Sequence, residues 1–298
     1  MMIRLCCLIA ISLVALTSVY SQTDDLKQEG LHGPVRSVRS QWIDSIPTEG
    51  GRSQQRPGQS TVLNFDRSGQ LVESIVYDDS NRLFGTEKFT HDAEGKLLTV
   101  ETTNEMGRPD GKFVYKYEGQ KLKETQDYDS KGVLVLKQTY VYGPDGKVLE
   151  DNYYEGPTLM GKTVYKHDAK GQILEAAFFL ADGSRAVAPL GPCYSAHRIA
   201  NKYNDAGQTI ETISYQPSGE VKQASSFRYD DKGNLKAEFR KDVYSTLDYL
   251  HEYEFDAHGN WVKETILNHA TRAAAPMLGI ESSESDHQTI RIRQITYY

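Results

Sequence analysis

The sequence predicts an all-β protein, a repetitive meander of antiparallel β-hairpins that forms an extended, twisted sheet. Three observations predict it: a turn motif recurs along the chain, apolar residues alternate with polar ones between the turns, and no convincing helical periodicity follows the first twenty residues. The 19 tyrosines and the many valines, isoleucines and threonines suit a pleated surface. We expect one domain over residues 22–298, with capping strands near Val35–Ile43 and Ile290–Tyr298.

The turn motif is an aromatic residue or His, then Asp or Asn, two variable residues, Gly, one further residue and usually a large apolar one. Asp accepts hydrogen bonds from backbone amides just ahead of it, and Gly supplies the positive φ that closes a type I turn into a bulged hairpin. Each copy therefore predicts a strand, a tight turn and a second strand. The seven copies are Phe65–Leu71, His91–Leu97, Tyr128–Leu134, His167–Ile173, Tyr203–Thr209, Tyr229–Leu235 and Phe255–Trp261.

Turn glycines recur at many intervals of 12 to 14 residues and at others about twice as long. The doubled intervals predict unmarked turns, for instance at Ser80–Asn81. Between turns the apolar residues share one parity, and the aromatic residue before each turn should lie opposite the apolar residue after it. We interpret the aromatic row as core, with a ligand-stacking surface as the alternative. The predicted structural turn residues are Gly69, Gly95, Gly132, Gly146, Gly171, Gly207, Gly233 and Gly259.

Residues 1–21 are predicted to be a signal peptide. Arg4 precedes an apolar run, Leu5–Leu16, and the residues up to Ser21 favour cleavage before Gln22. The run is shorter than the roughly 20 residues that span a bilayer, so we expect no membrane span after cleavage. Lipid attachment at the two cysteines of the run, or a retained anchor, are the alternatives. The mature chain would be exported and periplasmic, at the cell surface or extracellular.

Charge and cysteine content limit the partners and the covalent structure. Removing Arg4 from the 34 basic residues leaves 33 against 41 acidic ones, a net charge of −8 for the mature chain. An acidic chain with scattered Lys and Arg is a poor candidate for nucleic-acid binding. Signal cleavage leaves Cys193 as the single cysteine, so the sequence predicts no intramolecular disulfide.

Three regions interrupt the repeat and are expected to be irregular loops: 44–60, 185–198 and 268–288. Long loops on a rigid scaffold often carry function. Cys193 and His197 are the one Cys/His pair close in sequence, but no third group is marked to orient them. His251 lacks the second His that a helical zinc site needs, and the turns lack a calcium-loop pattern. The sequence therefore predicts no catalytic residue, metal or cofactor.

The copies Tyr229–Leu235 and Phe255–Trp261 resemble the YD repeat, also called the RHS-type repeat, of bacterial secreted and surface proteins. The ending Ile295–Tyr298 is similar to the closing strand of short single-domain members. The resemblance covers about residues 60–298 and implies a strip of β-hairpins in a cell-envelope setting. Large RHS proteins wrap a shell around a toxin, but this chain is too short for a shell and lacks a recognisable toxin domain.

The first functional hypothesis is a non-enzymatic secreted or cell-envelope module that binds a protein or glycan partner through a sheet face or a sheet edge. One alternative is an enzyme whose site is formed by the loops at 185–198 and 268–288. Another is a purely structural spacer. The absence of catalytic motifs from the sequence favours the first hypothesis.

Overall fold

The computed structural model describes residues 25–47, 53–187, 196–272 and 282–298. After a one-turn helix, α2 (Asp25–Gln28), the described chain forms strands throughout. The strands are β1 Val35–Pro47, β2 Ser53–Phe65, β3 Leu71–Tyr77, β4 Leu83–His91, β5 Leu97–Thr103, β6 Pro109–Glu118, β7 Lys121–Asp129, β8 Leu134–Tyr142, β9 Val148–Glu155, β10 Thr158–His167, β11 Ile173–Leu180, β12 Arg198–Tyr203, β13 Thr209–Tyr215, β14 Val221–Tyr229, β15 Leu235–Asp242, β16 Ser245–Phe255, β17 Trp261–Arg272 and β18 Ser283–Tyr297.

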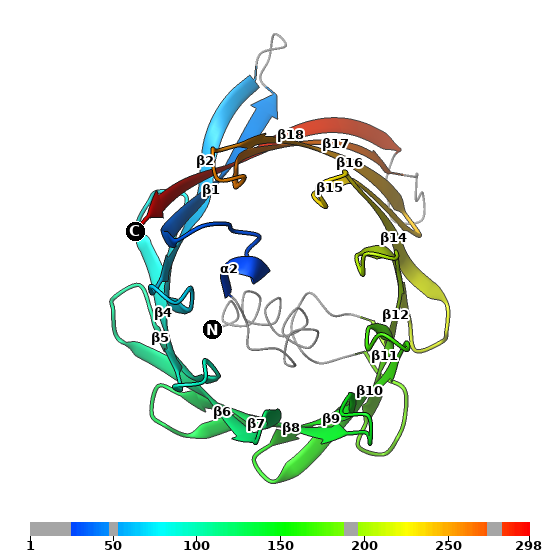
Figure 1. The fold of residues 1–298 in the computed structure, drawn as a ribbon. Helices are drawn as coiled ribbons and strands as arrows, with labels where there is room; N and C mark the ends of the chain where they lie inside the picture. The colour runs from blue at the N-terminus through cyan, green and yellow to red at the C-terminus, as the bar shows by residue number, and fades with distance from the viewer. Residues whose placement is uncertain (1–24, 48–52, 188–195, 273–281) are drawn as a thin grey trace.

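Each strand pairs antiparallel with the next along the chain, and β18 also pairs with β1, so the 18-stranded sheet closes into a barrel (Figure 1). Across this seam Val38 lies opposite Ile295 and Gln41 opposite Ile292. The predicted all-β antiparallel meander is confirmed, but the predicted extended sheet is wrong. Sheet twist brings the two expected capping strands together, and their pairing satisfies backbone groups that free edges would leave open.

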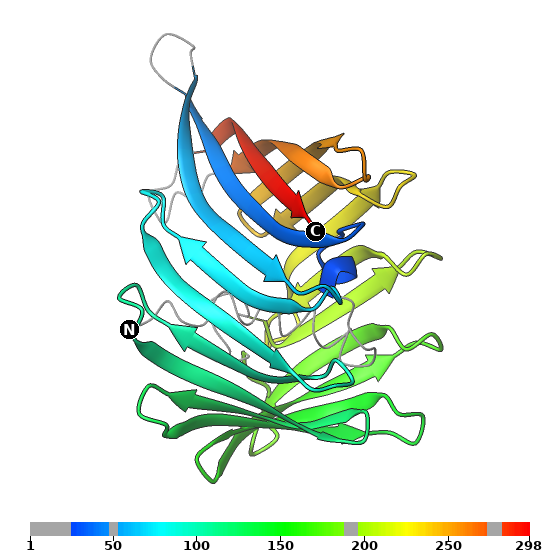
Figure 2. The same ribbon diagram turned by 60° about the vertical axis from the view of Figure 1, so that its left-hand side comes forward.

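In two of the three regions expected to be irregular, the described residues are largely strand. β1 and β2 form a long hairpin that occupies much of 44–60 and projects beyond the ring (Figure 2). Pro57 and Gly58 lie in β2 at a shift in register opposite Gln41 and Ile43. A bulge is one of the few places in a sheet where Pro is tolerated, which explains why these residues do not end the strand. β17 and β18 likewise continue into 268–288.

The hairpin turns follow the predicted chemistry. After Tyr229, the Asp230 carboxylate accepts hydrogen bonds from the amides of Lys232 and Asn234 at 2.9 and 2.8 Å. The Gly233 amide donates to the Asp230 carbonyl oxygen at 3.0 Å, which closes the turn. A turn also lies at Ser80–Asn81, where Asn81 takes the positive φ, +57°. All eight predicted turn glycines have φ between +77° and +90°.

Alternate turns lie at opposite rims of the barrel, because successive strands run in opposite directions. One rim is formed by the turns that follow the even-numbered strands from β2 to β16. We call it the aromatic rim, because an aromatic residue or His precedes each of these turns. Six motif copies lie at this rim, whereas the Tyr128 copy lies at the opposite rim. Tyr117 and Tyr142 occupy the two remaining places. The predicted cross-hairpin pairs all form: Phe65 with Leu71, His91 with Leu97, Tyr128 with Leu134, His167 with Ile173, Tyr203 with Thr209, Tyr229 with Leu235 and Phe255 with Trp261.

Tyrosine hydroxyls at the aromatic rim connect neighbouring hairpins. The hydroxyls of Tyr203 and Tyr229 donate to the carbonyl oxygens of Ile173 and Thr209, each at 2.8 Å. Each acceptor is the first residue after the previous turn at the same rim. The side chain at the aromatic position of the motif thus packs within its own hairpin, and a Tyr there also donates a hydrogen bond to the preceding hairpin. This bond stabilises the fold with Tyr at the position relative to Phe.

The position of α2 identifies the inner wall of the barrel. α2 lies inside the ring (Figure 1). Just after it, the Glu29 carbonyl oxygen accepts a hydrogen bond from Arg293 at 3.3 Å, so the strand face that carries Arg293 is the inner one. Side chains alternate along a strand and cross-strand partners share a face, so the registers assign the remaining residues. The outer wall then carries cross-strand ion pairs, namely Lys112–Glu101, Lys116–Glu124, Lys202–Glu211 and Lys263–Glu254.

Two apolar clusters lie on the inner wall. One consists of Leu31, Val35, Val38 and Phe65 and packs against Leu26 of α2; the other consists of Leu122, Tyr140, Val148 and Tyr165. The second borders Asp151, which is fully buried and accepts hydrogen bonds from Gln138 and Tyr165, each at 2.8 Å. Burial raises the pKa of Asp151 in spite of these bonds.

Candidate functional site

Three cross-strand pairs form a polar and aromatic strip on the inner wall of β1, β17 and β18. Trp42 lies opposite Arg291, Asp44 opposite Thr289, and Asn268 opposite His287. All six share the face of Arg293, and successive pairs lie progressively closer to the rim opposite the aromatic rim. We call these six residues the inner strip.

A buried carboxylate anchors one end of the inner strip. Glu264 of β17 is 3% exposed, and its oxygens lie 2.7 Å from the Arg291 guanidinium and 2.9 Å from His251 Nδ1. The Tyr253 hydroxyl donates to the same carboxylate at 2.9 Å. Burial on its own raises the pKa of Glu264, but the His251 hydrogen bond, the Arg291 charge and the Tyr253 hydrogen bond together hold it below its ordinary value. Glu264 is therefore an ionised group that fixes Arg291.

Two guanidinium groups stack on indole rings beside Glu264. The central carbon of Arg291 lies 5.0 Å from the centre of the Trp42 ring and 4.4 Å from that of Trp261, and the Arg293 carbon lies 3.7 Å from Trp261. Burial, followed by the nearby Arg291 charge, lowers the pKa of Arg293 to about 10. Trp42 remains 39% exposed, unlike the 9% exposed Trp261. Trp42 thus offers an aromatic surface that its own contacts hold in place.

Next to Trp42, at the opposite rim, a hollow of about 630 Å³ opens between β1, β2, β17, β18 and the β3–β4 turn. Its described lining is polar apart from Pro57 and Gly58, and it includes Asp44, Asn268, His287 and Thr289 of the inner strip. The Asn268 Oδ1 atom is buried and has no hydrogen-bond partner among the described residues. Thr289 donates to the Asp44 carboxylate over a long 3.4 Å. The hollow therefore presents hydrogen-bond acceptors with unused capacity.

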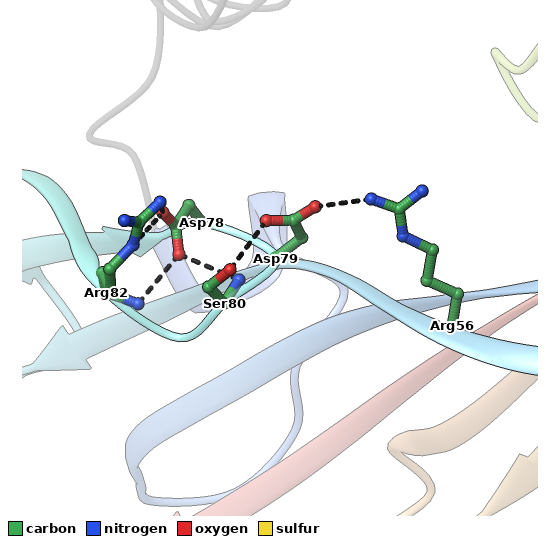
Figure 3. A network of polar contacts seen from close by, with 5 residues as sticks. All are labelled: Arg56, Asp78, Asp79, Ser80 and Arg82. Carbon is green, nitrogen blue, oxygen red and sulfur yellow. Dashed lines mark hydrogen bonds and ion pairs between the residues drawn. The ribbon is translucent and has the colours of Figure 1, made fainter.

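The other charged groups around the hollow are paired with one another. Arg56 of β2 lies 3.0 Å from the Asp79 carboxylate, and Arg82 lies 2.8 Å from the Asp78 carboxylate across the β3–β4 turn (Figure 3). Ser80 donates to Asp79 in the same turn. These pairs hold the turn beside the hollow and leave Asp44 as the lining carboxylate outside them.

The structure does not unite the sequence-predicted candidates. Cys193 lies outside the described residues, as does much of 185–198. His197 is 5% exposed, packs edge-on against Phe179 at 5.3 Å between ring centres, and bonds through its backbone to Phe178 and Tyr215. His251 pairs with Glu264 rather than with Glu252, its neighbour in sequence. Of the two loop regions in the enzyme hypothesis, 185–198 and 268–288, only the second contributes residues to the inner strip.

Sequence reasoning missed the inner strip because its signal is only the alternation Trp42–Asp44 in one strand and Thr289–Arg291–Arg293 in another.

Within the described ranges, no three His, Cys, Asp or Glu side chains are grouped to hold a metal ion. No helix in that part of the chain is long and apolar enough to cross a membrane.

Comparisons with known proteins leave the family open. No family model and no curated protein matches the chain. Among solved structures, a porin-like protein from Bacteroides uniformis aligns over 89% of this chain and 98% of its own, with 8% identity and a TM-score of 0.41. A LolA superfamily protein from Nitrosomonas europaea aligns over 95% of this chain and 93% of its own, with 8% identity and a TM-score of 0.23. A DUF1329 family protein from Desulfovibrio piger aligns over 95% and 92%, with 10% identity and a TM-score of 0.24. TM-scores this low carry no argument about function.

Proposed function

We propose that this chain is a non-enzymatic, exported module of the bacterial cell envelope that binds a polar partner, a glycan or a protein segment, on the inner wall of its barrel. The hairpin motif supports including it among the YD-repeat proteins as a short, single-domain member. The observation that carries the binding role is Trp42, a 39% exposed indole on the inner wall that is flanked by a guanidinium and by polar groups.

The two walls of the barrel support this assignment. Ion pairs such as Lys112–Glu101 and Lys263–Glu254 suit the outer wall to water, since charges on a lipid-facing strand surface are costly. Among the described strands, closure leaves no unpaired first or last strand for strand addition, so the faces are the main surfaces for a partner. Barrels of this strand number are too wide for wall side chains alone to fill, which leaves the inner wall room for a ligand.

Binding assays with a matched pair of variants test the proposal. Purified mature protein is mixed with peptidoglycan, with soluble oligosaccharides and with an unfolded model polypeptide, and binding is measured by co-sedimentation or calorimetry. We expect at least one probe to bind, and we expect Trp42→Ala to abolish that binding. Phe239→Ala is the control, because Phe239 is also 39% exposed but lies on the outer wall. Equal binding by both variants, or no binding of any probe by the wild type, contradicts the proposal.

A further inference from the structure

The hollow beside Trp42 has the size and chemistry of a small-molecule subsite. Its volume of about 630 Å³ falls within the roughly 300–1,000 Å³ of known ligand pockets. We infer that it accommodates an uncharged, hydroxyl-rich saccharide unit whose neighbouring unit lies on Trp42. This inference rests on the proposed function and names the ligand class for its site.

Charge around the hollow argues against an anionic ligand. The described lining holds the carboxylates of Asp44, Asp78 and Asp79 against the single guanidinium of Arg56, and the imidazole of His287 is its one other titratable group. Arg56 is already engaged by Asp79 at 3.0 Å, so it is not available to a phosphate or a uronate. An anion entering the hollow therefore meets three carboxylates and finds no unpaired guanidinium or ammonium group in the described lining.

Polarity argues equally against an apolar ligand. Pro57 and Gly58 are the sole apolar residues of the described lining, so a hydrocarbon chain would desolvate polar groups without compensation. The groups that seek partners are acceptors: Asn268 Oδ1 has none among the described residues, and the Asp44 carboxylate receives a 3.4 Å contact from Thr289. Sugar hydroxyls donate and accept, so they satisfy both acceptors and also use the neighbouring Asn268 amide and Thr289 hydroxyl.

Trp42 completes the subsite. It stands two residues before Asp44 on the same face of β1, so its ring lies on the same side of the strand as the Asp44 carboxylate that lines the hollow. A pyranose ring exposes an apolar C–H face that packs on an indole while its hydroxyl edge hydrogen-bonds, and this matches an aromatic surface that borders a polar hollow. Glu264 and Arg291 hold the Trp42 surface from behind, so the subsite is formed before the ligand arrives.

Calorimetric titration of the full mature chain tests the inference. The probes are N-acetylated chito-oligosaccharides and cello-oligosaccharides, which are uncharged, and oligogalacturonate, which is anionic. We expect at least one uncharged probe to bind and oligogalacturonate not to bind. Asn268→Leu removes the unpartnered acceptor while it keeps the branched shape and the number of side-chain heavy atoms, and it should weaken binding by about five- to tenfold. Asp44→Asn, at a group that faces the hollow, should also weaken binding, and it serves if Asn268→Leu does not fold. Asn152→Leu on the outer wall is the control and should bind as the wild type does.

The outcomes separate this inference from the proposed function. Binding of oligogalacturonate as tight as that of the uncharged probes overturns the inference, as does binding of an uncharged probe that Asn268→Leu and Asp44→Asn leave unchanged. If an unfolded polypeptide binds and Trp42→Ala abolishes it while no saccharide binds, the inference fails and the proposed function stands. If no probe of either class binds, both fail.

Discussion

Asn260 connects the start and the end of the chain to the β16–β17 turn, so its substitution should destabilise the whole barrel. Its side chain is fully buried. Asn260 Oδ1 accepts from the His32 amide at 2.6 Å, and Nδ2 donates to the His32 carbonyl oxygen at 2.9 Å and to the Tyr297 hydroxyl at 2.8 Å. Asn260→Ala removes all three bonds. Two of them join the turn to His32, 228 positions away in sequence, and the third joins it to Tyr297 of β18, 37 positions away.

The cost follows from the bonds lost. Each intramolecular hydrogen bond contributes about 0.5–1.5 kcal/mol, so three lost bonds predict a loss of about 1.5–4.5 kcal/mol in the free energy of unfolding. Asn234 provides a matched control, because it follows the turn glycine in the same way but its amide donates to Asp230 within its own turn, at 3.2 and 3.0 Å. Both contacts join one Nδ2 atom to one carboxylate, so Asn234→Ala should cost about 0.5–1.5 kcal/mol, the value of a single bond.

Urea unfolding monitored by far-ultraviolet circular dichroism measures both variants. This signal is preferable to fluorescence, because Trp261 adjoins Asn260 in sequence and would respond to the substitution directly. We expect a clear decrease in the unfolding midpoint for Asn260→Ala and a small one for Asn234→Ala. Equal decreases would refute the reasoning, because they would show that the bonds from Asn260 to His32 and Tyr297 contribute nothing beyond a local turn.

Three further predictions concern the repeat and the inner wall. Gly233→Val should cost about 1–2 kcal/mol because it forces a β-branched residue to φ +88°, whereas Gly233→Asn should cost much less; similar thermal midpoints would contradict this. Tyr229→Phe loses the bond to the Thr209 carbonyl oxygen and should cost about 0.5–1.5 kcal/mol in urea unfolding, and no change would be inconsistent with the hairpin connection. Burial raises the pKa of Glu87, so the stabilising contribution of its protonated form is present below the ordinary carboxyl pKa and is lost as pH rises through the raised pKa. Glu87→Gln should therefore stabilise the fold at neutral pH but not at acid pH. A variant that is as stable as the wild type at pH 7, or less stable, would argue against this.

The turns and strands could be predicted from sequence because their causes are local. Asp230 and Gly233 lie three residues apart, and their chemistry alone specifies a turn. The motif missed Tyr117 and Tyr142 because the turns that follow them begin with Glu118 and Gly143 instead of Asp or Asn. These turns achieve the same reversal with a different sequence, and the turn after Tyr142 is predicted through Gly146 although the aromatic position before it is not.

Closure and the inner strip could not be predicted, because both depend on residues far apart in the chain. Nothing near Val38 indicates that Ile295 will lie opposite it. The outcome depends on twist summed over the intervening strands. Likewise, the alternation at Trp42 and Asp44 predicts a strand but not which face is inner. Polar residues on an inner wall have the same pattern as polar residues on a solvent face, so sequence periodicity alone cannot separate them.

A disulfide across the β1–β18 seam tests the closed barrel most directly. In a Cys193→Ser background, Gln41→Cys and Ile292→Cys place two thiols at cross-strand partners of the outer wall, about 5 Å apart between Cα atoms. In an open sheet of this strand number the same positions would be about 80 Å apart. The control pair, Glu252→Cys and Thr265→Cys, lies within the β16–β17 hairpin and forms in either arrangement. Closure predicts that mild oxidation joins the seam pair within the monomer, seen as faster migration on a non-reducing gel. A seam pair that stays reduced while the hairpin pair oxidises would contradict the closed barrel.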